Sequence, residues 1–171
     1  MFVIRKARAA DVDAICDLIH GYARKLLLLP RTRMSIIEAL PLFRVATEEG
    51  RVVGCAALHV LWDDLAEVRS LAIDAGAQGK GYGRQLVEAL VEEAREMGIA
   101  RVMAFTYQES FFAKCGFHVV KKESLPQKVW KDCVNCAKFS HCDEIAMIRY
   151  VSIAPGEEVL SPVPAQDEGL A

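Results

Sequence analysis

A glycine-rich segment between a predicted strand and a predicted helix constrains this chain more than any other feature. The segment reads Gln78-Gly79-Lys80-Gly81-Tyr82-Gly83-Arg84. Its glycines let the backbone turn tightly and approach a ligand closely, and the start of the helix offers unpaired N–H groups to an anion. The segment fits neither the dinucleotide-binding fingerprint, because Arg84 replaces the third glycine, nor the P-loop, because glycine follows Lys80. We therefore expect either a diphosphate site or a glycine-rich turn without a ligand.

The chain before this segment predicts two helices and a run of strands. A good N-cap, Asp11, precedes apolar residues at helical spacing, and Pro41 ends the second helix. The predicted elements are a strand at 2–7, a helix after Asp11, a short helix at 32–40 and strands at 42–47, 52–61 and 65–73. Because short turns join the last three strands, we expect them to form an antiparallel meander.

The chain after the segment predicts a strand–helix–strand unit. Apolar residues recur every three or four positions from Tyr82 to Met97, and Gly98 follows where a helix ends. A strand at 101–107, a helical turn at 109–114 and strands that begin at 117 and 144 complete the pattern. The whole order is typical of an α/β sandwich around a mixed, mostly antiparallel central sheet.

Length and charge indicate one folded domain and exclude several classes of protein. The chain has 171 residues, and its 21 basic and 23 acidic side chains argue against broad nucleic-acid binding. We expect a single domain over residues 1–154 and a disordered, acidic, proline-containing tail over residues 155–171. With no apolar run of roughly 18 residues and no cleavable leader, the sequence predicts a cytoplasmic protein without membrane contact.

Two motifs together resemble those of the GNAT superfamily of N-acetyltransferases. One is Gln-x-x-Gly-x-Gly after the strand Glu67-Val68-Arg69-Ser70-Leu71-Ala72-Ile73-Asp74, and the other is Phe111-Phe112-Ala113-Lys114-Cys115-Gly116-Phe117. The resemblance covers about residues 2–151 and implies a GNAT-type fold with acetyl-CoA as acyl donor. It further implies that backbone groups of Leu71, Ala72 and Ile73 bind the pantetheine arm, while N–H groups from Gln78 to Arg84 hold the diphosphate.

A closer resemblance is to the short, stand-alone N-acetylglutamate synthases. Segments 53–62, 64–70, 104–107 and 125–133 are similar to those enzymes. The resemblance implies acetylation of L-glutamate, the first step of arginine biosynthesis, without the kinase-like domain that binds arginine in the larger synthases. A GNAT enzyme that acetylates a protein N-terminus, a lysine or another small amine is the alternative. Outside the enzymes, the alternative is a catalytically silent acyl-CoA sensor.

The resemblance implies that Glu67 is the catalytic base. The substrate amine must lose a proton before it attacks the thioester, and Glu67 matches the strand glutamate of the superfamily, acting through a water molecule. The other interpretation of Glu67 is an exposed strand carboxylate paired with Arg69. Many members carry a tyrosine acid where this chain has Phe112. The nearby hydroxyls of Tyr107 and Ser110 are therefore candidate acids, beside direct protonation of the thiolate by water.

Two carboxylates on glutamate require arginine side chains in the acceptor pocket. Arg31 and Arg33 lie in the loop that covers the acceptor site in this superfamily, and Arg69 shares a strand face with Glu67. The alternative interpretation of each arginine is a solvated surface charge. The histidines are interpreted as packing residues: His20, His59 and His118.

Two remaining features bear on metals and on self-association. Cys133, Cys136 and Cys142 have part of the spacing of a zinc site, but a fourth ligand would have to be His141, directly adjacent to Cys142. We therefore expect no metal, and instead free thiols in an insertion at about residues 124–143. Trp62 and the apolar meander offer a surface for a homodimer.

Overall fold

The computed structural model describes residues 1–125 and 142–152. Its helices and strands are β1 (Phe2–Lys6), α1 (Val12–Arg24), α2 (Arg33–Glu38), β2 (Phe43–Glu48), β3 (Arg51–Trp62), β4 (Leu65–Ile73), α3 (Tyr82–Glu96), β5 (Arg101–Thr106), α4 (Glu109–Lys114), β6 (His118–Val119) and β7 (Ile145–Tyr150). Each lies where the sequence predicts an element of its kind, although β6 is shorter than expected. The predicted tail at 155–171 and most of the predicted insertion lie outside the described residues.

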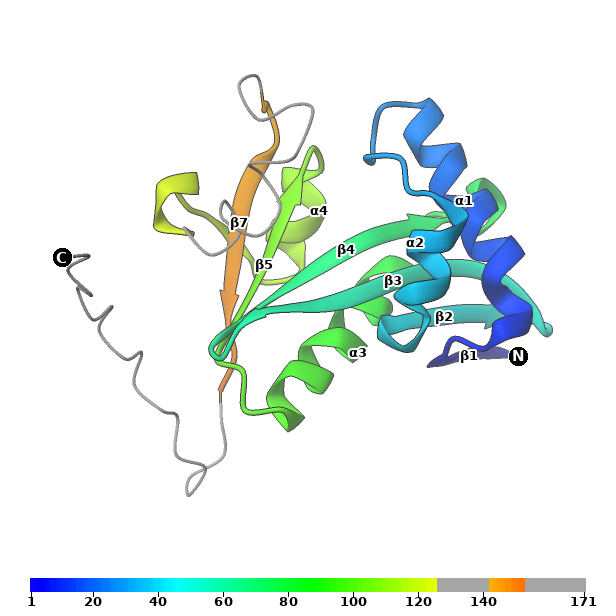
Figure 1. The fold of residues 1–171 in the computed structure, drawn as a ribbon, viewed down its shortest axis with the longest axis horizontal. Coiled ribbons are helices and arrows are strands. Elements are labelled where there is room, and N and C mark those ends of the chain that lie inside the picture. Colours follow the sequence, from blue (N-terminus) through cyan, green and yellow to red (C-terminus); the bar gives the residue numbers. More distant parts are fainter. Residues whose placement is uncertain (126–141, 153–171) are drawn as a thin grey trace, which may run out of the picture.

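The described strands form one sheet in the order β1-β2-β3-β4-β5-β7-β6. Neighbouring strands are antiparallel except β4 and β5, which are parallel, so the prediction of a mixed, mostly antiparallel sheet is confirmed. β4 and β5 pair only from Leu65–Arg101 to Glu67–Met103. Figure 1 shows the two strands meeting at one end and separating toward the other. We call the unpaired side of β4 after Glu67 the open edge of β4.

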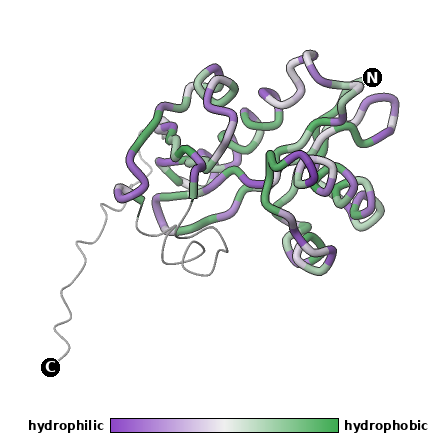
Figure 2. Tube along the Cα trace, turned by 90° about the horizontal axis from the view of Figure 1, so that it is seen from above, coloured by the Kyte–Doolittle hydropathy of each residue, from purple (hydrophilic) through white to green (hydrophobic). Residues whose placement is uncertain are grey.

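Helices cover both faces of the sheet (Figure 1). α1 and α2 pack on one face, where α1 buries Ile15 and Ile19 completely. α3 lies on the other face and buries Leu86 and Leu90. In Figure 2 the helices carry polar and apolar residues in alternation, as expected for helices that pack by one side only. Among the described residues, no helix is both long enough and apolar enough to cross a membrane.

A bulge at Ser70 changes which face the side chains of β4 reach. The register against β3 shifts there, so that two residues of β4 oppose one of β3. Ser70 has a φ of 56°, a left-handed conformation that is uncommon for residues other than glycine. Before the bulge, Glu67 and Arg69 point to the face that carries α1; after it, Leu71 and Ile73 point to the α3 face.

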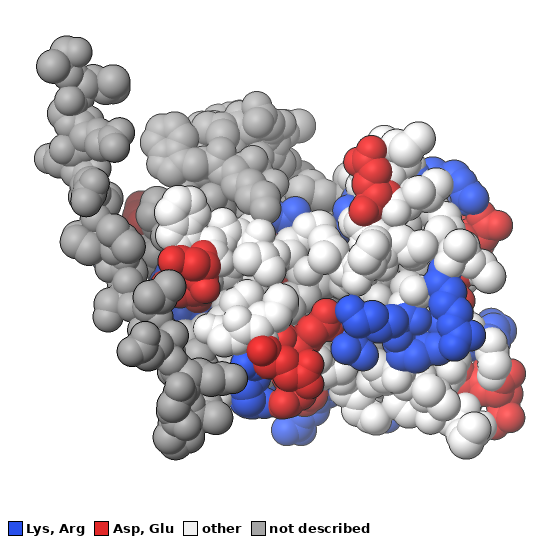
Figure 3. Space-filling model, turned by 60° about the horizontal axis from the view of Figure 1, so that its bottom comes forward, with Lys and Arg blue, Asp and Glu red and all other residues white. Residues whose placement is uncertain are grey.

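Ion pairs fasten α3 to the strands beside it. Glu93 accepts hydrogen bonds from Arg44 over 2.8 Å and from Lys6 over 3.4 Å. Glu88 accepts one from Arg149 over 2.6 Å. Figure 3, which turns the bottom of Figure 1 toward the reader, shows a band of basic side chains that adjoins acidic ones. Arg44, Lys6 and Arg149 therefore have acidic partners on α3.

The start of α1 departs from the prediction in one respect. Asp11 precedes the helix as expected, but its carboxylate caps no N–H group of α1. It accepts hydrogen bonds instead from the Arg5 guanidinium, at 2.7 and 3.0 Å, and from the Arg8 N–H at 2.7 Å. The hydrogen bond from Arg5 lowers the pKa of Asp11. The residue therefore ties β1 to the helix through a buried ion pair.

Candidate functional site

The open edge of β4 already has a hydrogen-bonding partner. The Ile73 N–H donates to the Tyr22 hydroxyl over 3.1 Å, and this hydroxyl donates to the Ile73 carbonyl over 3.2 Å. The Gln78 amide donates to the Tyr22 oxygen and to the Ile73 carbonyl, both over 3.3 Å. The side chain of Ala72 is buried under α1, and Leu71 packs against the α3-face core. The backbone that the resemblance assigns to pantetheine is thus held by Tyr22, which the sequence analysis did not single out.

The glycine-rich segment turns through left-handed conformations into α3. Gly79 and Gly81 each have a φ of 80°, and no atom within 4 Å would meet an added Cβ at either, so the backbone conformation itself requires glycine. Gly81 is the N-cap of α3. The first N–H groups of a helix have no partner within it, and the helix dipole favours an anion there. The local geometry therefore fits the predicted diphosphate site.

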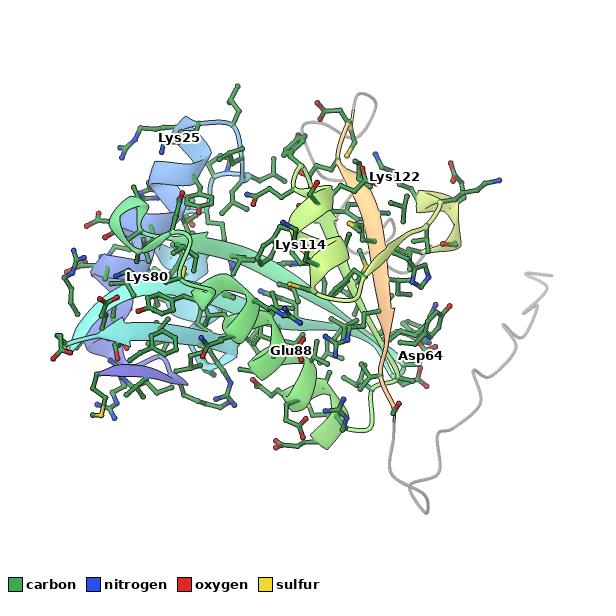
Figure 4. All side chains as sticks on the ribbon, turned by 180° about the vertical axis from the view of Figure 1, so that it is seen from behind. Lys25, Asp64, Lys80, Glu88, Lys114 and Lys122 are labelled. Carbon is green, nitrogen blue, oxygen red and sulfur yellow. The ribbon has the colours of Figure 1, made fainter. Side chains whose placement is uncertain are left out.

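Side chains of the glycine-rich segment bind it to Glu48, the last residue of β2. Lys80 lies 3.0 Å from a Glu48 carboxylate oxygen, and the Tyr82 hydroxyl donates to the same carboxylate over 2.8 Å. These bonds, first that of Tyr82 and then that of Lys80, lower the pKa of Glu48. Figure 4 labels Lys80 at the turn into α3. Gly83 is buried in the first turn, where an added Cβ would lie 3.2 Å from the Phe111 ring, while Arg84 is exposed.

Glu67 is buried on the face of the sheet that carries α1. Its side chain is only 2% exposed, and the Arg69 guanidinium donates to its carboxylate. Two apolar clusters flank this position: one under α1 and α2, and one that includes Leu65 and Met103. The alternative interpretation, an exposed carboxylate paired with Arg69, is therefore right about the partner and wrong about the exposure. A carboxylate oxygen has more than one lone pair, so a hydrogen bond from Arg69 does not by itself prevent the carboxylate from taking a proton.

Arg31 reaches the same face from the loop between α1 and α2. Its guanidinium donates to the Ser35 hydroxyl over 2.9 Å, to the Ser35 carbonyl over 3.3 Å and to the Ser70 hydroxyl over 3.1 Å. These three acceptors are neutral. Burial, and secondly the positive charge of Arg69, lower the pKa of Arg31. The guanidinium also lies 5.5 Å from the centre of the Phe43 ring. Arg31 and Arg69 therefore form, with Glu67, one charged cluster.

Arg33 is not part of this cluster. Its guanidinium pairs with Asp13 at the start of α1, and both side chains are exposed. This pairing, foremost the hydrogen bond that Arg33 donates to Asp13, raises the pKa of Arg33. Of the three arginines predicted for the acceptor pocket, the fold brings together Arg31 and Arg69.

The two candidate acids have different surroundings. The Tyr107 hydroxyl donates to the Asp143 carboxylate over 2.7 Å. Ser110 is exposed in the first turn of α4. Phe112 is 5% exposed and packs edge-to-face against Phe117 in the core on the α3 face. Its position belongs to the core, and replacing it with tyrosine would bury a hydroxyl.

The prediction that the histidines only pack is wrong for two of them. His20 places its Nε2 atom 3.1 Å from the Arg31 carbonyl, so it holds the loop that carries Arg31. His118 is exposed and stacks on Tyr150. His59 lies directly opposite Glu67 in the β3–β4 ladder. Counting back from a two-residue turn at Asp63-Asp64 would put Val60 opposite Glu67, and the register shift between Val60 and Trp62 brings His59 there instead, so the sequence held no signal for this pairing.

No group of three potential metal ligands occurs in the parts of the chain that the structure describes. Cys142 has a free, partly buried thiol. Cys133 and Cys136 lie outside the described residues, so the absence of a metal and the alternative zinc site both stay predictions.

An open strand edge followed by a glycine-rich turn into a helix, with a buried carboxylate nearby, is the arrangement of an acyltransferase. The sequence profile of the acetyltransferase (GNAT) family matches residues 14–117. The chain belongs to this family.

Two relatives cover most of the chain. An uncharacterized N-acetyltransferase of Chlorobaculum tepidum, CT2212, is 42% identical over 146 residues, which are 85% of this chain and 94% of the relative. The amino-acid acetyltransferase of Mycobacterium tuberculosis is 39% identical over 133 residues, 76% of each chain.

Two solved structures are similar in fold and sequence. The N-acetylglutamate synthase of Neisseria gonorrhoeae, complexed with coenzyme A and N-acetyl-glutamate, has a TM-score of 0.81 at 28% identity, with 89% of this chain covered. This chain spans only 35% of that synthase. The Mycobacterium tuberculosis protein Rv2747, in complex with CoA and NLQ, has a TM-score of 0.76 at 34% identity over 88% of this chain and 99% of its own. The expected GNAT-type fold and the resemblance to short synthases are confirmed.

Proposed function

We propose that this enzyme transfers the acetyl group of acetyl-CoA to the amino group of L-glutamate. One observation carries the proposal: Arg31 donates to the Ser70 hydroxyl on β4, next to Arg69, whose guanidinium donates to Glu67. Arg69 pairs with Glu67, and Arg31 adds a positive charge whose acceptors among the described residues are neutral. A carboxylate of the substrate would balance that charge and accept bidentate hydrogen bonds.

Acetyl-CoA is proposed to lie along the open edge of β4. The pantetheine arm would use backbone groups of residues 71–73, and the diphosphate would lie on residues 78–84. The positive-φ glycines and the N-terminus of a helix of 15 residues support this placement. Its support from relatives is the CoA bound in the two similar structures.

Glu67 is the proposed base. It would take the amine proton through a water molecule, so that the free amine attacks the thioester carbonyl. Backbone N–H groups at the edge of β4 would stabilise the oxyanion of the tetrahedral intermediate. As the intermediate collapses, the C–S bond breaks and CoA leaves as a thiolate.

Protonation of the thiolate is proposed to come from water. Tyr107 already donates its hydroxyl proton to Asp143, and Ser110 is exposed. A thiol with a pKa of roughly 8.5 is a tolerable leaving group without a dedicated acid. Tyr107 and Ser110 remain the candidates among the side chains.

The proposed metabolic pathway of the enzyme depends on which amine it acetylates. If glutamate is the substrate, the enzyme would catalyse the first step of arginine biosynthesis in the cytoplasm. A homodimer is also proposed, because Trp62 and Val60 at the end of β3 are 56% and 42% exposed.

The deciding experiment is an assay of thiol release from acetyl-CoA across a panel of amines. The panel contains L-glutamate, L-glutamine, the other free amino acids, and peptides with free N-termini or lysines. We expect L-glutamate to give the highest kcat/KM. Highest activity with L-glutamine or with peptides would contradict the proposed acceptor. No thiol release from any amine, with CoA binding intact, would support the sensor.

A further inference from the structure

Ile73 directs both of its backbone polar groups into the space between β4 and β5. Successive residues of a strand turn their hydrogen-bonding groups to opposite sides. The next residue, Asp74, donates its N–H to the Val53 carbonyl on β3 over 2.8 Å. Ile73 therefore faces away from β3: its N–H donates to the Tyr22 hydroxyl, and its carbonyl accepts from this hydroxyl and from the Gln78 amide. A ligand that adds to the open edge of β4 must meet the same two groups.

Tyr22 is suited to occupy this edge while no ligand is bound. A backbone N–H or C=O without a partner costs free energy when it is shielded from water. A tyrosine hydroxyl both donates and accepts, so one oxygen serves both groups of Ile73. The hydroxyl comes from the last turn of α1, outside the sheet, and Gln78 of the glycine-rich segment donates to it. The two proposed halves of the acetyl-CoA site thus meet at this oxygen.

We infer that the Tyr22 hydroxyl occupies the place of the pantetheine arm on β4, and that acetyl-CoA binds by displacing it from Ile73. The inference rests on the proposed placement of acetyl-CoA along residues 71–73. One N–H group does not serve two acceptors at full strength, so Tyr22 and the amides of the arm compete for Ile73. Tyr22 is thereby a positioning residue that sets the affinity for the acyl donor, and it takes no part in the chemical step.

The test compares Tyr22→Phe with wild type and with Tyr150→Phe. Tyr22→Phe keeps the ring and removes the competing hydroxyl. Tyr150 is 66% exposed on β7 and stacks on His118, so its substitution is a matched control. Calorimetry measures the Kd of CoA, which carries the arm, and of ADP, which carries the diphosphate without it. No glutamate is present, so failure of the proposed acceptor leaves this test unaffected.

We expect Tyr22→Phe to bind CoA about 3- to 10-fold more tightly than wild type, since binding no longer breaks the hydrogen bonds of the hydroxyl. ADP affinity should be unchanged, and Tyr150→Phe should match wild type for both ligands. Unchanged or weaker CoA binding by Tyr22→Phe would overturn the inference, because the hydroxyl would then be irrelevant to the arm or would support it.

Thermal melting gives an independent reading of the displacement. Without ligand, Tyr22→Phe should melt below wild type, because the Ile73 N–H has lost its acceptor and the Ile73 carbonyl one of its donors. With saturating CoA, the two proteins should melt at about the same temperature, because the wild type has then released the same contact. A difference in Tm that persists undiminished under saturating CoA would show that Tyr22 stays on Ile73.

Discussion

At the scale of single residues, Arg31 and Arg33 differ in their partners, so that one can be tested with the other as its control. They are two positions apart, Arg31 in the loop before α2 and Arg33 at the start of α2, yet Arg31 bonds to Ser70 on β4 whereas Arg33 pairs with Asp13 at the surface. A charge-assisted hydrogen bond to a substrate contributes roughly 1.5–3 kcal/mol. Arg31→Ala should therefore raise the KM for glutamate about 10- to 100-fold with little change in the KM for acetyl-CoA. Arg33→Ala is the control and should change neither constant; equal effects of both variants would refute this acceptor site.

Glu67 and Arg69 allow a second kinetic test. Glu67→Gln keeps the size of the side chain, removes the base and removes the negative charge that accepts from Arg69. We expect kcat to fall roughly 100- to 10,000-fold, as for loss of a general base. The KM for glutamate should not rise, because the cluster becomes more positive. Steady-state kinetics on the folded variant separate the two constants, and a kcat within a factor of about two of wild type would exclude Glu67 as the base.

Cys55 makes a residue-scale prediction about pH. Complete burial raises the pKa of its thiol from 9.0 to about 12, and the thiol donates to the Ser70 carbonyl. Because the folded pKa lies above the unfolded one, this contribution to stability is complete below pH 9.0 and is lost as pH rises toward 12. At pH 8 an alkylating reagent should therefore label Cys142 and spare Cys55 until the protein unfolds. Peptide mass spectrometry reads the labelling, and equal rates at both thiols would contradict the buried state.

Sequence patterns identified the residues of the site that sit in local motifs. The strand before the glycines located Glu67 and Arg69, and the loop after the first helix located Arg31. Tyr22 and Ser70 were missed as partners because their contacts span 51 and 39 positions of the chain. Neither the bulge that turns Ser70 toward Arg31 nor the reach of Tyr22 to β4 has a signature in the local sequence. The pairing of Arg33 with Asp13 was missed for the same reason.

At the scale of elements, the order of helices and strands was readable because each has its own periodicity and its own end signal. The close packing between α3 and the sheet, which we call the α3–sheet contact, was not readable from the sequence. Gly54 on β3 lies beneath this helix, where an added Cβ would be 2.7 Å from a methyl group of Ile73 and 3.2 Å from one of Leu86. A methyl group at Gly54 would therefore displace the ends of the Ile73 and Leu86 side chains, whereas the backbone angles of Gly54 do not themselves call for glycine.

The α3–sheet contact predicts that substitution of two different glycines changes the stability of the protein differently. Gly54→Ala should lower stability by roughly 1–3 kcal/mol, since the core must shift to admit a methyl group. At roughly 2–4 °C per kcal/mol for a domain of this size, the Tm should fall by several degrees. Gly21→Ala is the control: nothing lies within 4 Å of its added Cβ, and alanine favours the α1 helix. A Gly54→Ala variant that melts with or above the Gly21→Ala variant would contradict this packing.

At the scale of the whole molecule, the two substrates are proposed to approach the divergence of β4 and β5 from different sides. Glu67, Arg69 and Arg31 lie on the face that carries α1 and α2. The diphosphate segment leads into α3, which covers the opposite face (Figure 4). The edge of β4 lies between the two regions, and Tyr22 of α1 contacts both this edge and Gln78 of the glycine-rich segment. Both substrates can therefore be bound at once, with the amine and the thioester meeting at β4.

Simultaneous binding predicts the kinetic order of the reaction. Direct attack in a ternary complex gives double-reciprocal plots that intersect when acetyl-CoA and glutamate are both varied, and no acetyl-enzyme forms. The thiol that could act as an acyl carrier near the site, Cys115, is 3% exposed, and burial raises its pKa, so it is a poor nucleophile. Cys115→Ala should keep kcat within a factor of about two of wild type. Parallel plots, together with loss of turnover in a folded Cys115→Ala variant, would instead establish a ping-pong mechanism through this thiol.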